Sequence, residues 1–390
     1  MNQGNHRNVL AISLSQLGLA FSFNFIMVFL PFYSHAISSY SSKNTLIWLG
    51  FIMGAPSFAA AVASSYWGSL ASRISPKLLI MAGLLSHAVI ILIMGFVPHL
   101  PVLLVLRIIQ GLLGGISTVG LILISSSTSK ERVSRDMGLF QNCITFGQLT
   151  GPPAGALVAT MLGYKGAFIS ASVLVFATLV FCYFQVEDQP PAFRQSATIK
   201  KPAVSLKILF AWGLCFTTNV QIMFLPSVLP NVFNGFNMLE SAALKSAGMV
   251  VMLYTATAMA GTYFLSRLAD SFAKHKLVIF AAILGAVLQL FLAVCPGIRS
   301  FVIVRMLQTA MVAAVMPLVF SSFAEKLNER MIGFLNSSRF AGNALGPMIA
   351  TSVLAFSNLN WLFVSVGVMG LLAVLSYAAC GIFNSPESSE

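Results

Sequence analysis

The sequence contains very few charged residues. Only 8% of its 390 residues are Asp, Glu, Lys or Arg, whereas 57% are hydrophobic, and the mean hydropathy is +0.88. A water-soluble globular protein carries about 25% charged residues, so this composition excludes that class. The sequence therefore predicts an all-α polytopic protein embedded in a lipid bilayer.

The sequence also lacks the motifs by which enzymes and metal sites are recognised. The five cysteines show no metal-binding spacing, and the chain has neither a phosphate-binding Gly-Lys loop nor a plausible Ser/His/Asp set. Four of the cysteines lie within apolar runs, which is typical of packing residues rather than of disulfides. We therefore expect no enzymatic activity, no bound metal and no cofactor.

Carboxylates are absent from the middle of every apolar run, and basic residues gather in alternate loops. If the N-terminus is cytoplasmic, the loops on that side hold most of the Lys and Arg, and the opposite loops hold only Lys43, Lys165, Lys245 and Arg299. This asymmetry predicts cytoplasmic N- and C-termini. It also accounts for the net charge of +12 without a nucleic-acid partner. The expected location is a bacterial inner membrane.

Twelve apolar runs, each near the roughly 20 residues that cross a bilayer, account for most of the chain. They fall at about 9–36, 46–71, 78–96, 101–126, 136–161, 165–185, 204–233, 242–268, 276–294, 300–322, 332–356 and 360–383. We predict a first six-helix bundle over 1–185, a cytoplasmic linker over 186–203, a second six-helix bundle over 204–384 and a cytoplasmic tail over 385–390.

The second half of the chain repeats the first. Gly138, Gly147, Gly151 and Pro152 each have a counterpart 195 positions later, at Gly333, Gly342, Gly346 and Pro347. Each half is far too long for one span or a hairpin. The repeat therefore predicts that the two bundles are pseudo-symmetric copies of each other.

Glycines recur at every fourth residue inside the fifth apolar run. On a helix, Gly147, Gly151 and Gly155 share one face, which allows a neighbouring backbone to approach closely. Pro152 and Pro153 remove backbone donors and favour a kink. The stretch predicts a tight, bent contact between two spans.

Three arginines lie inside predicted spans, where an unpaired charge is costly and usually has a function. Arg107 and Arg305 occupy matching places in the two halves, whereas Arg339 has no basic counterpart. In one interpretation each guanidinium ties together span backbones and polar neighbours such as Gln110. The other interpretation is a direct part in transport. We favour the first for Arg305 and the second for Arg339, and leave both open for Arg107.

Polar amides lie near the middle of the first helix of each half. Asn24 and Asn219 occupy equivalent places, with Gln221 within one turn. Each amide either bonds to a neighbouring helix or faces an aqueous cavity, and the equivalence favours the cavity. Nearby Phe and Met residues either form an adaptable apolar surface for a ligand or pack against lipid and core. The expected substrate-binding set is Asn24, Asn219, Gln221, Phe25, Met223 and Arg339.

Three stretches match a set of known sequence motifs. Residues 68–77 read Gly-Ser-Leu-Ala-Ser-Arg-Ile-Ser-Pro-Lys, Leu104 to Gly111 fits a Leu-x-x-Arg-x-x-Gln-Gly pattern, and Gly147 to Gly155 fits Gly-x-x-x-Gly-Pro-x-x-Gly. Together they resemble the motifs of the major facilitator superfamily, and within it those of the twelve-span drug:proton antiporters. The resemblance covers nearly the whole chain and implies the major facilitator fold.

The resemblance also implies roles for particular residues. The loop between the second and third spans would latch the inner ends of the halves, with a degenerate copy at Asp270. The glycine-rich helix, a motif of exporters, would close the outer side. The implied gating residues are Gly68, Arg73, Lys77, Asp270, Gly147, Gly151, Pro152, Gly155, Gly346 and Pro347.

Arg107 and Gln110 would take part in proton coupling, by the same resemblance. Two features depart from the family pattern. Ser72 replaces the loop aspartate, and the embedded carboxylate common in such antiporters is missing from the first half. Proton coupling thus rests on the resemblance alone.

We therefore expect a monomeric secondary exporter that moves small amphipathic, drug-like molecules across the inner membrane by alternating access and proton antiport. One alternative is an exporter of an anionic metabolite, such as a carboxylate siderophore or an organophosphate, because the buried arginines lack embedded acids. Another alternative, from a different class, is a non-transporting membrane receptor or scaffold, which has little need of a polar interior.

Overall fold

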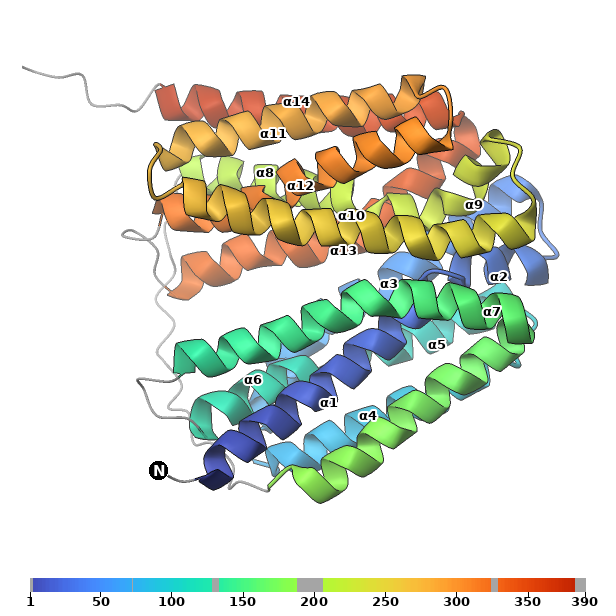
Figure 1. Ribbon diagram of the computed structural model, residues 1–390, viewed down its shortest axis with the longest axis vertical. Coiled ribbons are helices and arrows are strands. Elements are labelled where there is room, and N and C mark those ends of the chain that lie inside the picture. Colours follow the sequence, from blue (N-terminus) through green and yellow to red (C-terminus); the bar gives the residue numbers. More distant parts are fainter. Residues whose placement is uncertain (1–2, 72, 128–132, 188–205, 324–328, 383–390) are drawn as a thin grey trace, which may run out of the picture. The chain divides into compact units, whose positions relative to one another are not determined.

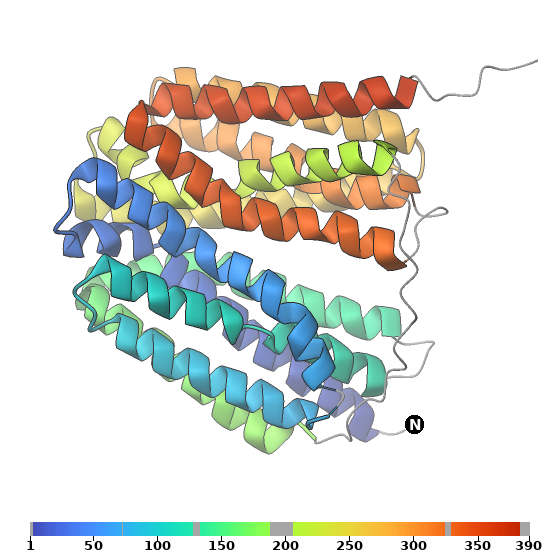
Figure 2. The same ribbon diagram turned by 180° about the vertical axis from the view of Figure 1, so that it is seen from behind.

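The computed structural model describes residues 3–71, 73–127, 133–187, 206–323 and 329–382. Within these residues every regular element is a helix (Figures 1 and 2). A backbone polar group cannot be left unpaired in hydrocarbon, and a helix pairs its groups within a single segment. The all-α class expected from the composition is confirmed.

The helices of the first half follow the predicted runs. They are α1 (Gln3–Met27), α2 (Leu30–Ile37), α3 (Ser42–Leu70), α4 (Pro76–Met94), α5 (Leu100–Leu112), α6 (Ile116–Ser127) and α7 (Val133–Gln185). The first run is split between α1 and α2, and the fourth between α5 and α6. α7 contains the fifth and sixth runs, joined at Gly163, whose φ of 70° favours glycine.

The second half has a similar order of elements. They are α8 (Leu206–Met223), α9 (Leu225–Gly235), α10 (Glu240–Leu268), α11 (Lys274–Phe291), the short 3-10 helix η1 (Leu292–Val294), α12 (Ile298–Phe323), α13 (Glu329–Phe356) and α14 (Leu359–Ile382). The seventh run is split between α8 and α9. The predicted linker beyond residue 187 and the predicted tail lie outside the described residues, as does Ser72.

Each of the twelve predicted runs coincides with a helical segment. In the described part of the chain, ten segments are long and apolar enough to cross a membrane. That number counts α7 once for two runs and leaves out α13, whose hydropathy is lowered by polar residues such as Asn336, Arg339 and Asn343. α13 has 28 residues, about 42 Å at 1.5 Å per residue, which is enough to span a bilayer. The helices are consistent with twelve spans.

The breaks in the first and seventh runs have the same cause. Pro31 is the second residue of α2, and Pro226 is the second residue of α9. Proline has no N–H, so the carbonyl four residues earlier loses its helical donor. The carbonyls of Met27 and Ile222, which lie at the ends of α1 and α8, are therefore available to other donors.

The chain divides into two compact units. The first unit comprises residues 1–41, 51–197 and 239–252, and the second comprises 42–50, 198–238 and 253–390. Within the first unit α7 packs against α1 and α4, and within the second α8 packs against α12, α13 and α14 (Figures 1 and 2). Each unit is thus a helix bundle with its own interior.

The predicted glycine face of α7 lies directly against α1. A methyl group at Gly147 would come within 2.7 Å of the Phe21 nitrogen, and one at Gly151 within 2.6 Å of the Phe21 oxygen. At Gly155 it would collide with the backbone of Phe25. The absence of side chains therefore lets the two backbones touch, as the spacing predicted.

The repeat places the same kind of contact in the second unit. A methyl group at Gly342 on α13 would lie 2.9 Å from the Phe216 oxygen on α8 and 2.5 Å from the Asn219 Cβ. At Gly346 the nearest atom, Met223 Cβ, would be 3.3 Å away. The contact of α13 with α8 is therefore close, although looser at its second glycine than the contact of α7 with α1.

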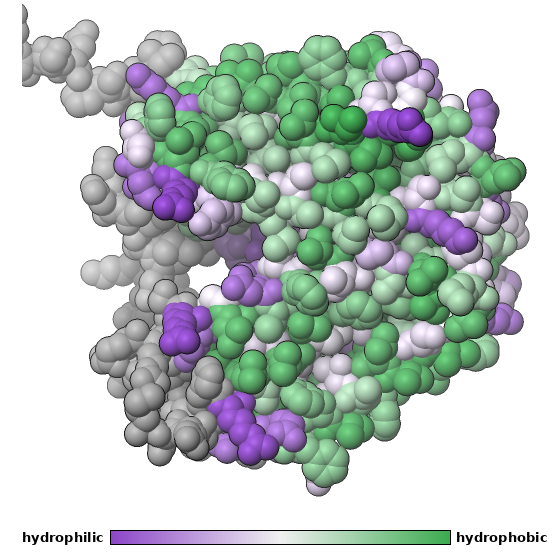
Figure 3. All heavy atoms as spheres, in the orientation of Figure 1, coloured by the Kyte–Doolittle hydropathy of each residue, from purple (hydrophilic) through white to green (hydrophobic). Residues whose placement is uncertain are grey.

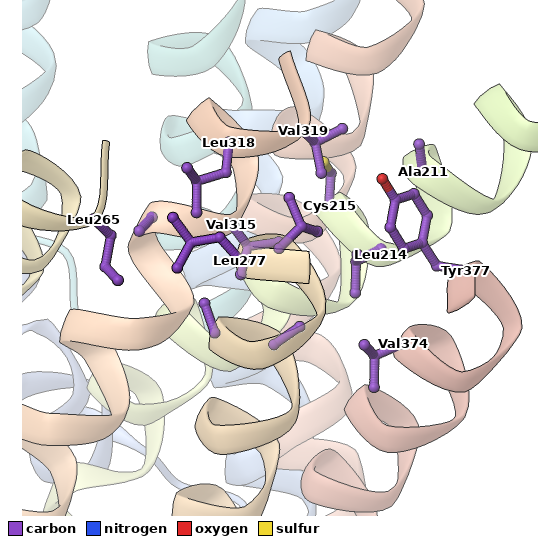
Figure 4. Packing of buried hydrophobic residues seen from close by; sticks show 14 of the residues in the cluster. Ala211, Leu214, Cys215, Leu265, Leu277, Val315, Leu318, Val319, Val374 and Tyr377 are labelled. Carbon is purple, nitrogen blue, oxygen red and sulfur yellow. The ribbon is translucent and has the colours of Figure 1, made fainter. Parts of the chain in front are cut away.

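Interlocked apolar side chains fill the interior of the second unit (Figure 4). Lipid is as apolar as these side chains, so close van der Waals packing rather than exclusion of water holds the helices together. The labelled residues of this cluster are Ala211, Leu214, Cys215, Leu265, Leu277, Val315, Leu318, Val319, Val374 and Tyr377.

Apolar side chains also cover the outer surface of the helices. Hydrophobic residues occupy much of the face shown in Figure 3. On α7, Val173, Phe176, Val180 and Phe184 are exposed at helical spacing and form one apolar stripe. Such a stripe is suited to contact with acyl chains.

We expect Gly155→Ala to destabilise the first unit, because the added methyl group must push α1 and α7 apart. Overpacking of this kind costs about 1–3 kcal/mol. Gly138→Ala is the matched control on the same helix, since no atom lies within 4 Å of its added methyl group. Thermal unfolding of the two purified variants should show a lower Tm only for Gly155→Ala. An unchanged Tm for Gly155→Ala would mean that the helices do not touch there.

Candidate functional site

Each unit buries an arginine on the fourth span of its half. Arg107 on α5 and Arg305 on α12 are 1% and 0% exposed. A glutamine follows each of them three residues later on the same helix face, and Gln110 and Gln308 are buried as well. The repeat thus places the same two side chains in the interior of both units.

The Arg107 guanidinium contacts four groups in the first unit. One of them is on its own helix, and the other three are on α1 and α3. Nε donates to the Ile52 carbonyl at 3.1 Å, and Nη1 donates to Gln110 Oε1 at 2.6 Å. Nη2 donates to Met27 Sδ at 2.9 Å, and Cζ lies 5.3 Å from the centre of the Phe23 ring. Every one of these partners is electrically neutral.

The carbonyl that Arg107 reaches on α3 is one that lacks a helical donor. Pro56 lies inside α3 and has no N–H, so the carbonyl of Ile52, four residues earlier, is left unpaired by the helix. Arg107 Nε supplies that missing hydrogen bond. The contact lets α3 keep an internal proline without a buried, unsatisfied carbonyl.

Arg305 does the same at the break between α8 and α9. Its Nη2 donates to the Ile222 carbonyl at 2.8 Å, the carbonyl that Pro226 leaves free. Its Nη1 donates to the Gln221 carbonyl at 2.8 Å and to Gln308 Oε1 at 2.7 Å. The guanidinium therefore caps the last turn of α8, which agrees with the structural interpretation favoured for Arg305.

Further polar groups close the network around Arg305. Gln308 Nε2 donates to Gln221 Oε1 at 3.2 Å, so both side chains of the glutamine pair are engaged. Two rings, Phe224 and Tyr254, lie with their centres 5.1 and 4.9 Å from the guanidinium carbon. In the first unit, by contrast, Gln110 Nε2 is buried without a hydrogen-bond partner. The two halves share the arginine and the glutamine, but the glutamine amide has a hydrogen-bond partner only in the second unit.

The amides of Asn24 and Asn219 bond within their own helices. Asn24 Nδ2 donates to the Ala20 carbonyl and Asn219 Nδ2 to the Cys215 carbonyl, each at 2.8 Å. Asn24 is partly exposed, whereas Asn219 is 7% exposed. The donors that we expected to face a cavity or to bond a neighbouring helix are thus used mainly by the preceding turn of the same helix. Asn219 Nδ2 also lies 3.9 Å from Met316 Sδ on α12. A ligand-binding role of the two amides stays a prediction.

Two other members of the expected ligand set are packed inside their units. Phe25 is 2% exposed and stacks edge-on against Phe29, and Gln221 is 1% exposed and bonded to Gln308. Helix packing encloses Phe25 and the Arg305 network holds Gln221, and the role of both in ligand binding stays a prediction. Met223, at the end of α8, is exposed.

Arg339 lies on α13 with its side chain exposed and its Cζ 5.5 Å from the centre of the Phe340 ring. Unlike Arg107 and Arg305, it is not enclosed by the helices of its unit. This placement keeps a direct role in ligand binding open for Arg339, and that role stays a prediction.

Sequence patterns did not reveal an aromatic stack shared by α8 and α13. The rings of Trp212 and Phe216 lie parallel within 4°, with centres 5.5 Å apart, and Phe334 stacks on Trp212 at 6.1 Å. Trp212 Nε1 donates to Ser337 Oγ at 2.9 Å, which fixes the indole. The three rings are only partly buried. The spacing of four between Trp212 and Phe216 was the one available signal.

Of the residues predicted to form the inner latch, Lys77 bonds to another helix. Lys77, in the first turn of α4, donates from Nζ to the Tyr183 carbonyl in the last turn of α7 at 2.9 Å. Arg73 and Asp270 are exposed, and Gly68 has no neighbour within 4 Å of an added methyl group. The Lys77 contact joins two helices of the first unit, and the gating role of the loop stays a prediction.

Among the residues that the structure describes, no three His, Cys, Asp or Glu side chains are placed to hold a metal ion. The cysteines at 143, 182, 215, 295 and 380, all within the described residues, form no disulfide.

Comparison with known proteins gives a consistent family. The sequence matches the model of the Major Facilitator Superfamily over residues 12–244 and again over 211–390. A protein of Salmonella arizonae named multidrug resistance protein MdtG is 26% identical over 368 residues, which cover 91% of each chain. The Escherichia coli protein of that name is 26% identical over 396 residues, covering 98% of this chain and 97% of its own.

Solved structures agree with the fold. A bacterial homologue of the human lysosomal transporter Spinster, solved in an inward-facing and occupied conformation, has a TM-score of 0.76 at 13% identity and covers 96% of each chain. The human organic anion transporter MFSD10 has a TM-score of 0.68 at 16% identity, covering 96% of this chain and 99% of its own. Similarities at this identity establish the fold alone.

We expect Arg305→Lys to lower the Tm more than Arg107→Lys does. The three donors of lysine lie on one nitrogen, so it cannot reproduce the fork in which Arg305 Nη1 and Nη2 bond separate acceptors. Each lost hydrogen bond to a buried charge costs about 1.5–3 kcal/mol. Arg107 bonds one carbonyl and one amide oxygen, and its third acceptor is a weak thioether. Thermal unfolding of the two purified variants measures the difference. An equal or larger loss for Arg107→Lys would contradict this ranking of the two networks.

Proposed function

Because the chain belongs to the Major Facilitator Superfamily, whose members are membrane transporters rather than enzymes, we propose that it is a secondary exporter of small amphipathic compounds. It works by alternating access in a bacterial inner membrane, with both termini in the cytoplasm. Proton antiport supplies the energy. Its substrates are drug-like molecules that combine aromatic or apolar surface with polar groups.

Sequence relatives support the substrate class. The proteins of Salmonella arizonae and Escherichia coli that match nearly the whole chain are both named for multidrug resistance. At 26% identity their fold and general activity are a sound basis for a proposal, whereas the choice of compound depends on side chains that differ.

The observation that carries the proposal is the aromatic stack on α8 and α13. Trp212, Phe216 and Phe334 are partly exposed aromatic residues, and aromatic rings accept many aromatic compounds through stacking without demanding one hydrogen-bond pattern. Met223, exposed on α8, adds a flexible side chain that adapts to ligands of different shape. A broad specificity follows from this combination.

An anionic substrate is the second candidate, and Arg339 is the observation that favours it. The guanidinium is exposed on a spanning helix, where a cation without a partner is costly. A carboxylate or phosphate on the substrate would offset that cost and bind in a bidentate manner. Arg339→Ala should then abolish transport of anions and spare neutral dyes.

Inside-out membrane vesicles with an acidic lumen test the export proposal. We expect a lipophilic cationic or neutral dye to accumulate in the lumen and to leave when an uncoupler removes the pH gradient. Trp212→Ala should raise the half-saturating dye concentration about two- to tenfold, because one stacking contact contributes roughly 0.5–1.5 kcal/mol. Trp361→Ala, which truncates an exposed tryptophan at the start of α14, is the matched control and should transport normally.

Two outcomes would overturn the proposal. Accumulation of anions alone, lost in Arg339→Ala, would assign the protein to the second candidate. No accumulation or counterflow of cationic, neutral or anionic compounds in proteoliposomes would favour a non-transporting receptor or scaffold on the same fold.

A further inference from the structure

The cluster around Arg107 is a buried cation in a neutral shell. Arg107 is 1% exposed, and its partners are a carbonyl, an amide oxygen, a thioether and an aromatic ring. Enclosing a charge without a compensating charge carries a large free-energy cost. The cluster would therefore be stabilised by a negative charge.

Two hydrogen-bond donors of this cluster are poorly used. Within the described ranges Arg107 Nη2 donates only to Met27 Sδ, and a thioether sulfur is a weak acceptor. Gln110 Nε2 is buried and has no hydrogen-bond partner among the described residues, and the whole side chain is 1% exposed. The two side chains belong to one helix face, three residues apart.

The second unit provides an internal reference for this arrangement. There the equivalent guanidinium nitrogen bonds the Ile222 carbonyl, and the equivalent Gln308 Nε2 bonds Gln221 Oε1. Arg305 Nε is the atom left without a partner in that network. An open pair of donors, one from the arginine and one from the glutamine, is therefore specific to the first unit.

We propose that Arg107 and Gln110 bind a compact monovalent anion, in the place that the Met27 sulfur holds in this structure. The anion is free chloride or the carboxylate group of a small compound, which present the same chemistry to the two donors. Either anion would replace the Met27 sulfur, a weak hydrogen-bond acceptor, with a strong acceptor and would neutralise the charge of the guanidinium.

Met27 is suited to exchange with such an anion. Its side chain is unbranched and has three rotatable bonds, so it can swing aside without a change in the backbone. It is also partly exposed and is the last residue of α1, next to the break before α2. The Met27 sulfur accepts the Arg107 hydrogen bond when no anion is bound, and Arg107 Nε stays bonded to the Ile52 carbonyl in both states.

The test is the thermal stability of the purified full-length protein as chloride replaces the bulky sulfonate anion MES, which carries no carboxylate, at constant ionic strength and without any transported compound. A ligand that binds only the folded state raises the Tm in a saturable way. We expect such a rise with chloride. A parallel titration with formate identifies the source, since stabilisation by formate and not by chloride assigns the site to carboxylates. No response to either anion would overturn the proposal.

Variants at Gln110 and Met27 test whether the anion binds at this cluster. Gln110→Leu should raise the half-saturating anion concentration about tenfold, the factor expected for one lost hydrogen bond. Met27→Leu removes the competing acceptor at similar volume and should lower that concentration. Met27→Gln supplies a strong neutral acceptor in the same place and should weaken or abolish the response.

Gln308→Leu is the matched control, because it removes the equivalent amide from the closed network of the second unit. Its own Tm is expected to fall, but the anion-dependent increment should equal that of the wild type. If this variant does not fold, the opposite effects of the two Met27 variants still decide the question. Identical responses in both Met27 variants would contradict the site, and because no transport is measured, the result is independent of the proposed export function.

Discussion

A proline in a membrane helix leaves a carbonyl that water cannot reach, and the two buried arginines in the described part of the chain each bond to such a carbonyl. Arg107 serves the carbonyl freed by Pro56, and Arg305 serves the one freed by Pro226. In hydrocarbon an unsatisfied carbonyl costs several kcal/mol, so helices can bend at these prolines only where a donor is supplied. The guanidinium is the side chain with the most donors for that purpose.

The two halves use the same arginine and glutamine to different extents. Around Arg305 the carbonyls of α8, Gln308 and Gln221 form a closed network, which fixes the break between α8 and α9. Around Arg107 one guanidinium nitrogen meets a thioether, and the adjacent glutamine amide has no partner. A transporter built from duplicated halves can keep one copy of a motif for structure and leave the other free to respond to a ligand.

Composition, periodicity and repetition were enough to predict the helical class, the positions of the spans and a close contact at the glycine face of α7, although not that α1 is its partner. The partners of Arg107 could not be predicted, because a carbonyl has no side-chain signature and Pro56 has no counterpart in the second half. The amides of Asn24 and Asn219 were expected to face a cavity, yet their donors bond to carbonyls of their own helices, which is open to any asparagine in a helix. The Trp212 stack could not be predicted, because its rings come from two helices that are far apart in the sequence, α8 and α13.

A double-mutant cycle between Arg305→Lys and Pro226→Ala tests the dependence of arginine on proline most directly. Alanine at position 226 restores an N–H that can bond the Ile222 carbonyl, so the arginine is no longer its only donor. We predict that Arg305→Lys destabilises the Pro226→Ala protein by about 1–3 kcal/mol less than it destabilises the wild type. An equal loss of stability in both backgrounds would show that Arg305 does not compensate for the proline.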